Sequence, residues 1–181
     1  MKSIPPELDI PPAQMQEFLH ECGLADAAET PEFEQLGGGV SSAIFKVRLA
    51  SGDYCIKKPL ERLKVEKQWL VPVDRVYAEI DWLTLAHQWV PGRVPEVLGV
   101  SHAFGLYVME YLDSAKYANW KDNLFNEVVD DGVGTQIAVL LATLHARTAY
   151  DAQLARQFAN HENFYLLRLE PYLIESARLN P

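Results

Sequence analysis

The sequence has few cysteines and few basic residues, and each shortage excludes a class of protein. Only two of the 181 residues are cysteines, and the positions of Cys22 and Cys55 fit neither a disulfide scaffold nor a zinc site. There are 16 Lys and Arg against 25 Asp and Glu, which gives a net charge of −9. This charge argues against binding to nucleic acid or to an anionic membrane surface.

The sequence also lacks the hydrophobic segments that serve membrane insertion or export. No stretch approaches the ~18 apolar residues of a membrane span, and the first residues contain no apolar signal-peptide core. We therefore expect a cytoplasmic protein with no membrane partner. The hydrophobic content of 49% is ordinary for a globular domain, and the chain is long enough to bury a core.

The pattern of apolar residues predicts helices and short strands in a mixed order. The predicted elements are a helix at 12–23, strands at 33–36, 43–49 and 54–57, a helix that begins at 74 and ends before 91, strands at 97–101 and 106–110, and helices at 134–149 and 162–179. Asp74 is a candidate N-cap. The spacing of Ile137, Leu140, Leu141 and Leu144 predicts that the helix at 134–149 is well buried. Pro171 is expected to divide the last helix.

Three glycines, Gly37, Gly38 and Gly39, stand between the first two predicted strands. Glycine has no Cβ, so the backbone N–H groups of such a turn can approach phosphate oxygens closely. Three glycines between strands are more often a simple turn, and the full G-x-G-x-x-G pattern is absent. The turn alone is therefore a weak indication of a nucleotide site.

A lysine and a glutamate strengthen this interpretation. Alternation along the third strand places Cys55 and Lys57 on one face of the sheet and leaves Lys58 on the other, where we expect it to face solvent. Glu79 lies on the apolar stripe of the following helix, and a carboxylate there needs a partner. Lys57 is the natural partner. Loop, strand lysine and helix glutamate in this order are more specific than any one of them.

Five segments together resemble a known family. They are LGGGVSSAIFKV, YCIKKPL, DRVYAEIDWL, GLYVMEYL and LLATLHA. They are similar to the N-terminal portion of the aminoglycoside phosphotransferase family, the small-molecule branch of the protein-kinase-like fold that includes choline and methylthioribose kinases. The resemblance runs from about residue 33 to residue 181.

The resemblance implies an α+β fold: a kinase-like N-lobe with a five-stranded antiparallel sheet and one inserted helix, then the first helices of an incomplete C-lobe. It implies a helical lead-in at 1–32, a nucleotide-binding N-lobe at 33–112 and the start of the C-lobe at 113–181. It also implies ATP with Mg as cofactor. The implied nucleotide-binding residues are the phosphate-loop residues Gly37, Gly38, Gly39, Ser41 and Ser42, the phosphate-contacting Lys57 with its partner Glu79, and the adenine-pocket residues Met109, Glu110 and Leu112, of which Glu110 and Leu112 use backbone groups.

The catalytic part of the family pattern is absent from the sequence. None of the five histidines is followed by the Gly-Asp and later Asn of the family's catalytic loop. We therefore expect this chain alone not to transfer phosphate, and we expect the Mg ligands and most of the pocket for a small hydroxyl-bearing acceptor to lie outside it. Exposed apolar faces of the last helices would favour a homodimer. Two alternatives stay open: a non-catalytic kinase-like interaction or regulatory module, and a plain α+β domain whose glycines only form turns.

Overall fold

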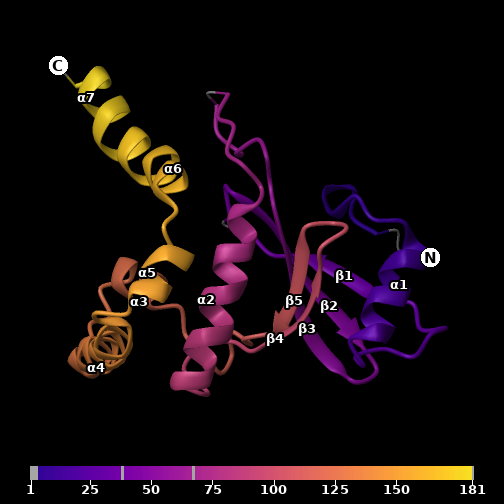
Figure 1. The fold of residues 1–181 in the computed structure, drawn as a ribbon. Coiled ribbons are helices and arrows are strands. Elements are labelled where there is room, and N and C mark those ends of the chain that lie inside the picture. Colours follow the sequence, from indigo (N-terminus) through magenta and orange to yellow (C-terminus); the bar gives the residue numbers. More distant parts are fainter. Residues whose placement is uncertain (1–3, 38, 67, 181) are drawn as a thin grey trace.

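A computed structural model describes residues 4–37, 39–66 and 68–180. An antiparallel sheet lies between an N-terminal helix, α1 (Pro12–Glu21), and a longer helix, α2 (Arg75–Trp89), and further helices extend away on the far side of α2 (Figure 1). No helix in these ranges combines the length and the apolar character needed to cross a membrane.

The sheet has five strands in the spatial order β1-β2-β3-β5-β4, and all neighbouring pairs are antiparallel. The strands are β1 (Glu32–Gln35), β2 (Ser42–Leu49), β3 (Gly52–Pro59), β4 (Val97–Ser101) and β5 (Leu106–Glu110). Helix α2 (Arg75–Trp89) is inserted after the third strand. This is the predicted α+β arrangement of a kinase-like N-lobe, and the fold class is confirmed.

The strand register assigns side chains to the two faces of the sheet. Ile44 pairs with Lys57 and Lys57 pairs with Tyr107, so these three side chains lie in a row on one face. The neighbouring row, which includes Ile56 and Val108, lies on the opposite face. A lysine and a tyrosine therefore occupy one face at the centre of the sheet, and apolar side chains occupy the other.

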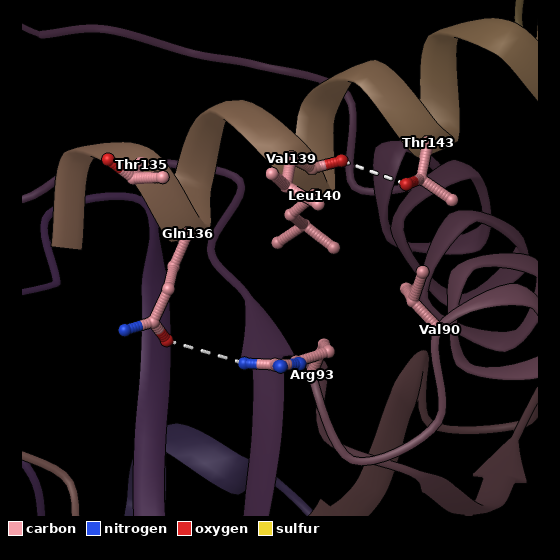
Figure 2. Close-up of a pocket in the computed structure, with 7 residues that line it drawn as sticks. All are labelled: Val90, Arg93, Thr135, Gln136, Val139, Leu140 and Thr143. Atoms are coloured by element: carbon pink, nitrogen blue, oxygen red, sulfur yellow. Dashed lines mark hydrogen bonds between the residues drawn. The ribbon is translucent and has the colours of Figure 1, made fainter. Parts of the chain in front are cut away.

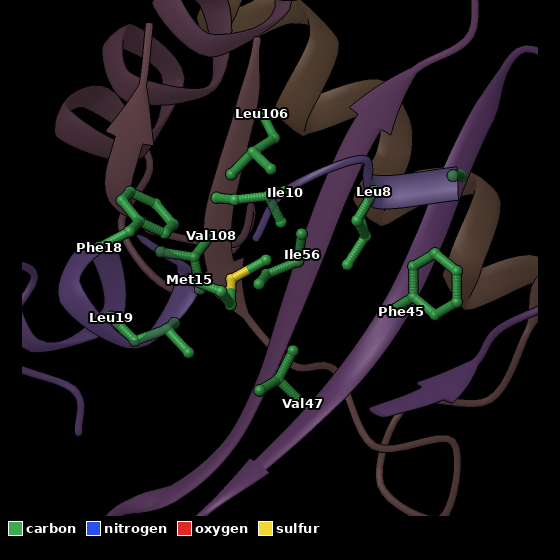
Figure 3. Close-up of a cluster of buried hydrophobic side chains, with 11 residues drawn as sticks. Leu8, Ile10, Met15, Phe18, Leu19, Phe45, Val47, Ile56, Leu106 and Val108 are labelled. Carbon is green, nitrogen blue, oxygen red and sulfur yellow. The ribbon is translucent and has the colours of Figure 1, made fainter. Parts of the chain in front are cut away.

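The apolar face is covered by the N-terminal segment (Figure 3). This segment comprises the short 3₁₀ turn η1 (Pro6–Leu8) and α1 (Pro12–Glu21). The buried cluster contains Leu8, Ile10, Met15, Phe18, Leu19, Ala43, Phe45, Val47, Ile56, Leu106 and Val108. The segment also corrects one prediction. Lys58 does not simply face solvent, because its Nζ donates a hydrogen bond of 2.6 Å to the Leu8 carbonyl.

The other face is covered in part by α2. Val76 and Ile80 are buried against Tyr107, and Leu83 packs at the edge of this second cluster. The predicted apolar stripe of the helix is therefore correct. Asp74 occupies the N-cap position, but its side chain accepts no hydrogen bond from the first turn of the helix.

The second half of the chain is helical and exposed. Its elements are α3 (Trp120–Phe125), α4 (Asp131–Thr148), α5 (Ala152–Gln157), α6 (His161–Phe164), the π-helical segment η2 (Tyr165–Glu175) and α7 (Ser176–Leu179). The prediction that α4 is well buried is wrong. Leu144 is its only side chain described as buried, while Val139 and Leu141 are 62% and 45% exposed. An apolar stripe shows that one side of a helix is suited to burial, but it does not show that another element of the chain packs against that side.

The expected break at Pro171 is also wrong, because the helical backbone continues through it as η2. Proline lacks the N–H that would bond to a carbonyl on the preceding turn. The carbonyls of Leu166 and Leu167, which lie one turn earlier, accept side-chain donors instead. Trp69 Nε1 donates to Leu166 at 3.1 Å and Arg168 Nη1 donates to Leu167 at 2.9 Å. These donors and the wider π turn accommodate the proline.

A close approach between α1 and β4 yields a test of the fold. A Cβ added at Gly99 would lie 2.1 Å from the Cys22 Sγ atom and 3.3 Å from a methyl of Val108. We expect Gly99→Ala to lower the free energy of unfolding by about 1–3 kcal/mol, measured by denaturant titration, because the core is overpacked. Adding Cys22→Ala should restore part of the loss.

Gly134→Ala is the matched control. Gly134 lies in α4, and an added Cβ there would meet nothing within 4 Å. This variant should raise the free energy of unfolding by up to about 1 kcal/mol, because alanine favours the helix. Equal stability of the Gly99→Ala protein and the wild type would contradict the packing of α1 on β4.

Candidate functional site

An ion pair joins the sheet to α2. The Lys57 ammonium on β3 donates to Glu79 Oε1 on α2, and the two side chains are 19% and 39% exposed. The pair therefore lies at an edge of the interior that a ligand can reach. Burial raises the pKa of the neighbouring Cys55 thiol to about 11, so this group stays neutral near pH 7 and does not compete with Glu79 for the lysine.

Tyr107 lies beside this pair, and the sequence reasoning did not find it. Its side chain is fully buried, and its hydroxyl lies close to Glu79 without a well-formed hydrogen bond to any described residue. Burial raises the pKa of this hydroxyl well above its ordinary value, and the nearby Glu79 charge raises it further. The alternation of β5 could have indicated its position, because Tyr107 shares a face with Met109 and stands opposite Lys57.

The glycine turn lies over the same face. The Leu36 N–H donates to the Ile44 carbonyl at 2.9 Å and closes the turn. A Cβ added at Gly39 would lie 3.1 Å from the Ser42 carbonyl and 3.4 Å from Ile44 Cδ1, so Gly39 packs against the Ile44 side chain. Ile44 pairs with Lys57. The turn and the lysine are therefore neighbours on one face of the sheet.

The other expected members of the phosphate loop have different surroundings. Gly38 lies outside the described residues, and a Cβ added at Gly37 would meet nothing within 4 Å. Ser42 begins β2 and is only 8% exposed, so its side chain is not open to a ligand. The Ser41 carbonyl accepts a hydrogen bond of 3.0 Å from the Leu60 N–H, which fixes the exit of the turn to the end of β3.

At the end of β5, some backbone groups of the described residues are engaged in hydrogen bonds within the protein, and others are free to bind a ligand. The Glu110 N–H donates to the Glu96 carbonyl at 3.0 Å, and the Glu110 carboxylate accepts from the Glu96 N–H at 2.9 Å. Of the expected adenine contacts of Glu110, only the carbonyl could serve. Leu112 is 46% exposed, and its N–H makes no hydrogen bond within the described part of the chain. Met109 packs against the cluster under α2.

Among the cavities of the described structure, one lies beside the glycine turn and another lies away from the ion pair. One of about 430 Å³ opens beside Val40 and Ser41 and is lined mainly by apolar side chains, among them Trp69 and Tyr172. The second, of about 210 Å³, lies between the end of α2 and α4 (Figure 2). Its lining includes Val90, about three helical turns beyond Glu79, so it is separate from the ion pair.

The described residues do not supply a metal centre, because no three His, Cys, Asp or Glu side chains among them are placed to hold one ion. They do fit a phosphate-bearing ligand. A part-exposed ammonium, a glycine turn over the same face and an unengaged N–H near the end of β5 offer positive groups to anionic oxygens and to a flat ring edge.

Comparison with known proteins assigns the chain to a family. The model of the phosphotransferase enzyme family matches residues 32–178, which include all five strands and α2. The chain belongs to this family. A search of curated proteins finds no match.

Part of this phosphotransferase-family chain is also similar to a solved structure from Thermobifida fusca YX-ER1 that is assigned as a fructosamine-3-kinase. The identity is 20% and the TM-score is 0.33. The similar region covers 54% of this chain and 32% of that one, so it spans less than a third of the solved protein.

The buried hydroxyl of Tyr107 can be tested directly. Tyr107→Phe removes only a buried oxygen without a well-formed hydrogen bond, so we expect the free energy of unfolding to be unchanged or to rise by about 1 kcal/mol. Tyr54→Phe is the control, because the Tyr54 hydroxyl donates to Ser51 Oγ at 3.1 Å and its loss should slightly destabilise the protein. A loss greater than about 1 kcal/mol for Tyr107→Phe would show that the hydroxyl is bonded after all.

Proposed function

We propose that residues 33–112 form the nucleotide-binding part of a small-molecule kinase, which transfers the γ-phosphate of ATP to a hydroxyl of a small acceptor. Lys57 carries this proposal, because its ammonium is held by Glu79 on the face over which the glycine turn lies. Membership of the phosphotransferase enzyme family supports the same class of reaction.

Each group has a proposed role in holding ATP, which supplies the phosphoryl group. Lys57 binds the α- and β-phosphates, as in the kinase template. Glu79 orients the ammonium, and the turn around Gly37 and Gly39 offers backbone N–H groups to phosphate oxygens. Because the side chain of Ser42 is buried, Ser42 would contribute only through its backbone, whereas Ser41 is half-buried and would offer its hydroxyl.

The adenine ring is proposed to lie at the end of β5. Its edge would meet the Glu110 carbonyl and the Leu112 N–H, and Met109 would close the back of the pocket. We assign no Mg ligand and no catalytic base within this chain, because its sequence lacks the Asp and Asn pattern that phosphoryl transfer requires. The alternative is a non-catalytic kinase-like interaction or regulatory module.

We also propose self-association through exposed apolar side chains of the second half, namely Val139, Leu141, Tyr172 and Leu173. Exposed apolar patches favour contact with a second copy. Light scattering should give the mass of a dimer, and Leu141→Asp should shift it toward the monomer. A monodisperse wild-type monomer would contradict this proposal.

Removing the lysine tests the nucleotide proposal. We expect Lys57→Ala to weaken ADP binding by about 10- to 100-fold, because a charged hydrogen-bond donor to the phosphates is lost. Isothermal titration of the purified chain measures this affinity, with adenosine as a reference ligand that lacks phosphates.

Lys58→Ala is the matched control, since Lys58 is adjacent in β3 but reaches the Leu8 carbonyl on the opposite face. It should leave the ADP affinity unchanged. Equal effects of the two substitutions, or no binding of ADP to the wild type, would contradict the proposed function.

A further inference from the structure

The guanidinium of Arg75, the first residue of α2, donates to four backbone carbonyls. Two acceptors are nearby in sequence: Val71 at 3.2 Å and Pro72 at 2.7 Å. The other two belong to distant segments: Ser41 at 2.6 Å, at the exit of the glycine turn, and Leu60 at 2.8 Å, just after β3. One side chain therefore joins the turn, the sheet and the helix.

The environment of Arg75 suits a side chain that joins the glycine turn, the sheet and α2. Partial burial lowers the pKa of its guanidinium, while the charges of Glu79 and Asp74 oppose that shift, and arginine remains charged at any relevant pH. Its five N–H donors lie in one rigid plane, so it can bond to several fixed acceptors at once. Because these acceptors are carbonyls, the side chain fixes backbone positions.

Further hydrogen bonds strengthen the junction at the exit of the turn. The Ser41 carbonyl also accepts from the Leu60 N–H at 3.0 Å, and the Val40 carbonyl accepts from the Lys64 N–H at 2.8 Å. The entry of the turn is fixed separately by the bond from Leu36 to the Ile44 carbonyl. Gly37 and Gly39 therefore lie between one anchor on the sheet and a second anchor that includes α2.

Arg75 and Glu79 are four residues apart, so they lie on the same side of α2. Glu79 holds Lys57, and Arg75 holds the exit of the glycine turn. We propose that Arg75 is a positioning residue that ties the glycine turn to α2, so that one helix sets the placement of the turn and of Lys57 together. This inference rests on the proposed function, in which the turn and Lys57 contact the same phosphates.

Preorganisation is the expected benefit. A phosphate chain that meets both the turn and Lys57 binds more tightly if their relative position is fixed beforehand. The ribose and adenine would not depend on this link. The loss should therefore appear in the phosphate-dependent part of the affinity, which is the ratio of the dissociation constants of adenosine and ADP.

The test uses Arg75→Ala and Arg75→Lys in the 181-residue chain. Lysine keeps the charge, but its single ammonium cannot reproduce the planar donor set that bonds Ser41 and Leu60 together. In both variants we expect the ratio of the adenosine and ADP dissociation constants to fall about tenfold or more. Arg93→Ala is the control, because Arg93 carries the same charge beyond the other end of α2 and its side chain donates to Gln136 Oε1 at 3.4 Å, away from the glycine turn.

A second readout needs no ligand. Amide hydrogen exchange, followed by NMR, should be faster by about tenfold at Leu60 and Lys64 in the Arg75 variants, because their acceptors lie at the exit of the turn. The amides of Leu36 and Leu63, which bond to the carbonyls of Ile44 and Trp69, should change little, because none of these residues accepts a hydrogen bond from Arg75 in the described part of the chain.

The two readouts separate the possible failures. Faster exchange at Leu60 and Lys64 without any ADP binding by the wild type would uphold the tie and reject the proposed function. Unchanged exchange with an unchanged affinity ratio would overturn the role of Arg75 even if ADP binds. If Arg75→Ala does not fold, the same two measurements on Arg75→Lys decide the matter.

Discussion

The ion pair between Lys57 and Glu79 is the contact on which the arrangement of the site depends. An ammonium and a carboxylate that are partly removed from water need each other, because either alone would lose solvation without compensation. The pair can form only if α2 keeps a fixed distance and rotation relative to β3. The packing of Val76 and Ile80 on Tyr107 provides this constraint.

The two faces of the sheet have different roles, because one stabilises the fold and the other carries the groups proposed to bind the nucleotide. One face is apolar and is covered by η1 and α1, which bury a continuous cluster (Figure 3). The other face carries Lys57 and Tyr107 and is covered only in part, by α2 and the glycine turn. Because β-strands alternate their side chains, one short segment such as β3 contributes to both faces at once.

The local sequence pattern was sufficient to predict the features that depend on neighbouring residues, namely the strands and the face of the sheet on which each side chain lies. Alternation predicted the strands and placed Lys57 and Lys58 on opposite faces, and the position of Glu79 on the next helix selected Lys57. The sequence did not reveal contacts between distant segments. The bond from Lys58 to the Leu8 carbonyl and the bond from Arg75 to the Ser41 carbonyl each join distant parts of the chain. The exposure of α4 was missed for a related reason, since a stripe does not identify what covers it.

The central claim is that the glycine turn, Lys57 and the end of β5 bind one nucleotide on one face of the sheet. The most direct measurement is a two-dimensional amide NMR titration of the labelled chain with ADP. The account predicts shifts that cluster at Gly37, Gly39, Lys57 and Leu112 and saturate together, with only the Leu112 region responding to adenosine. No shifts at these positions, or shifts confined to the cavity between α2 and α4 (Figure 2), would contradict it.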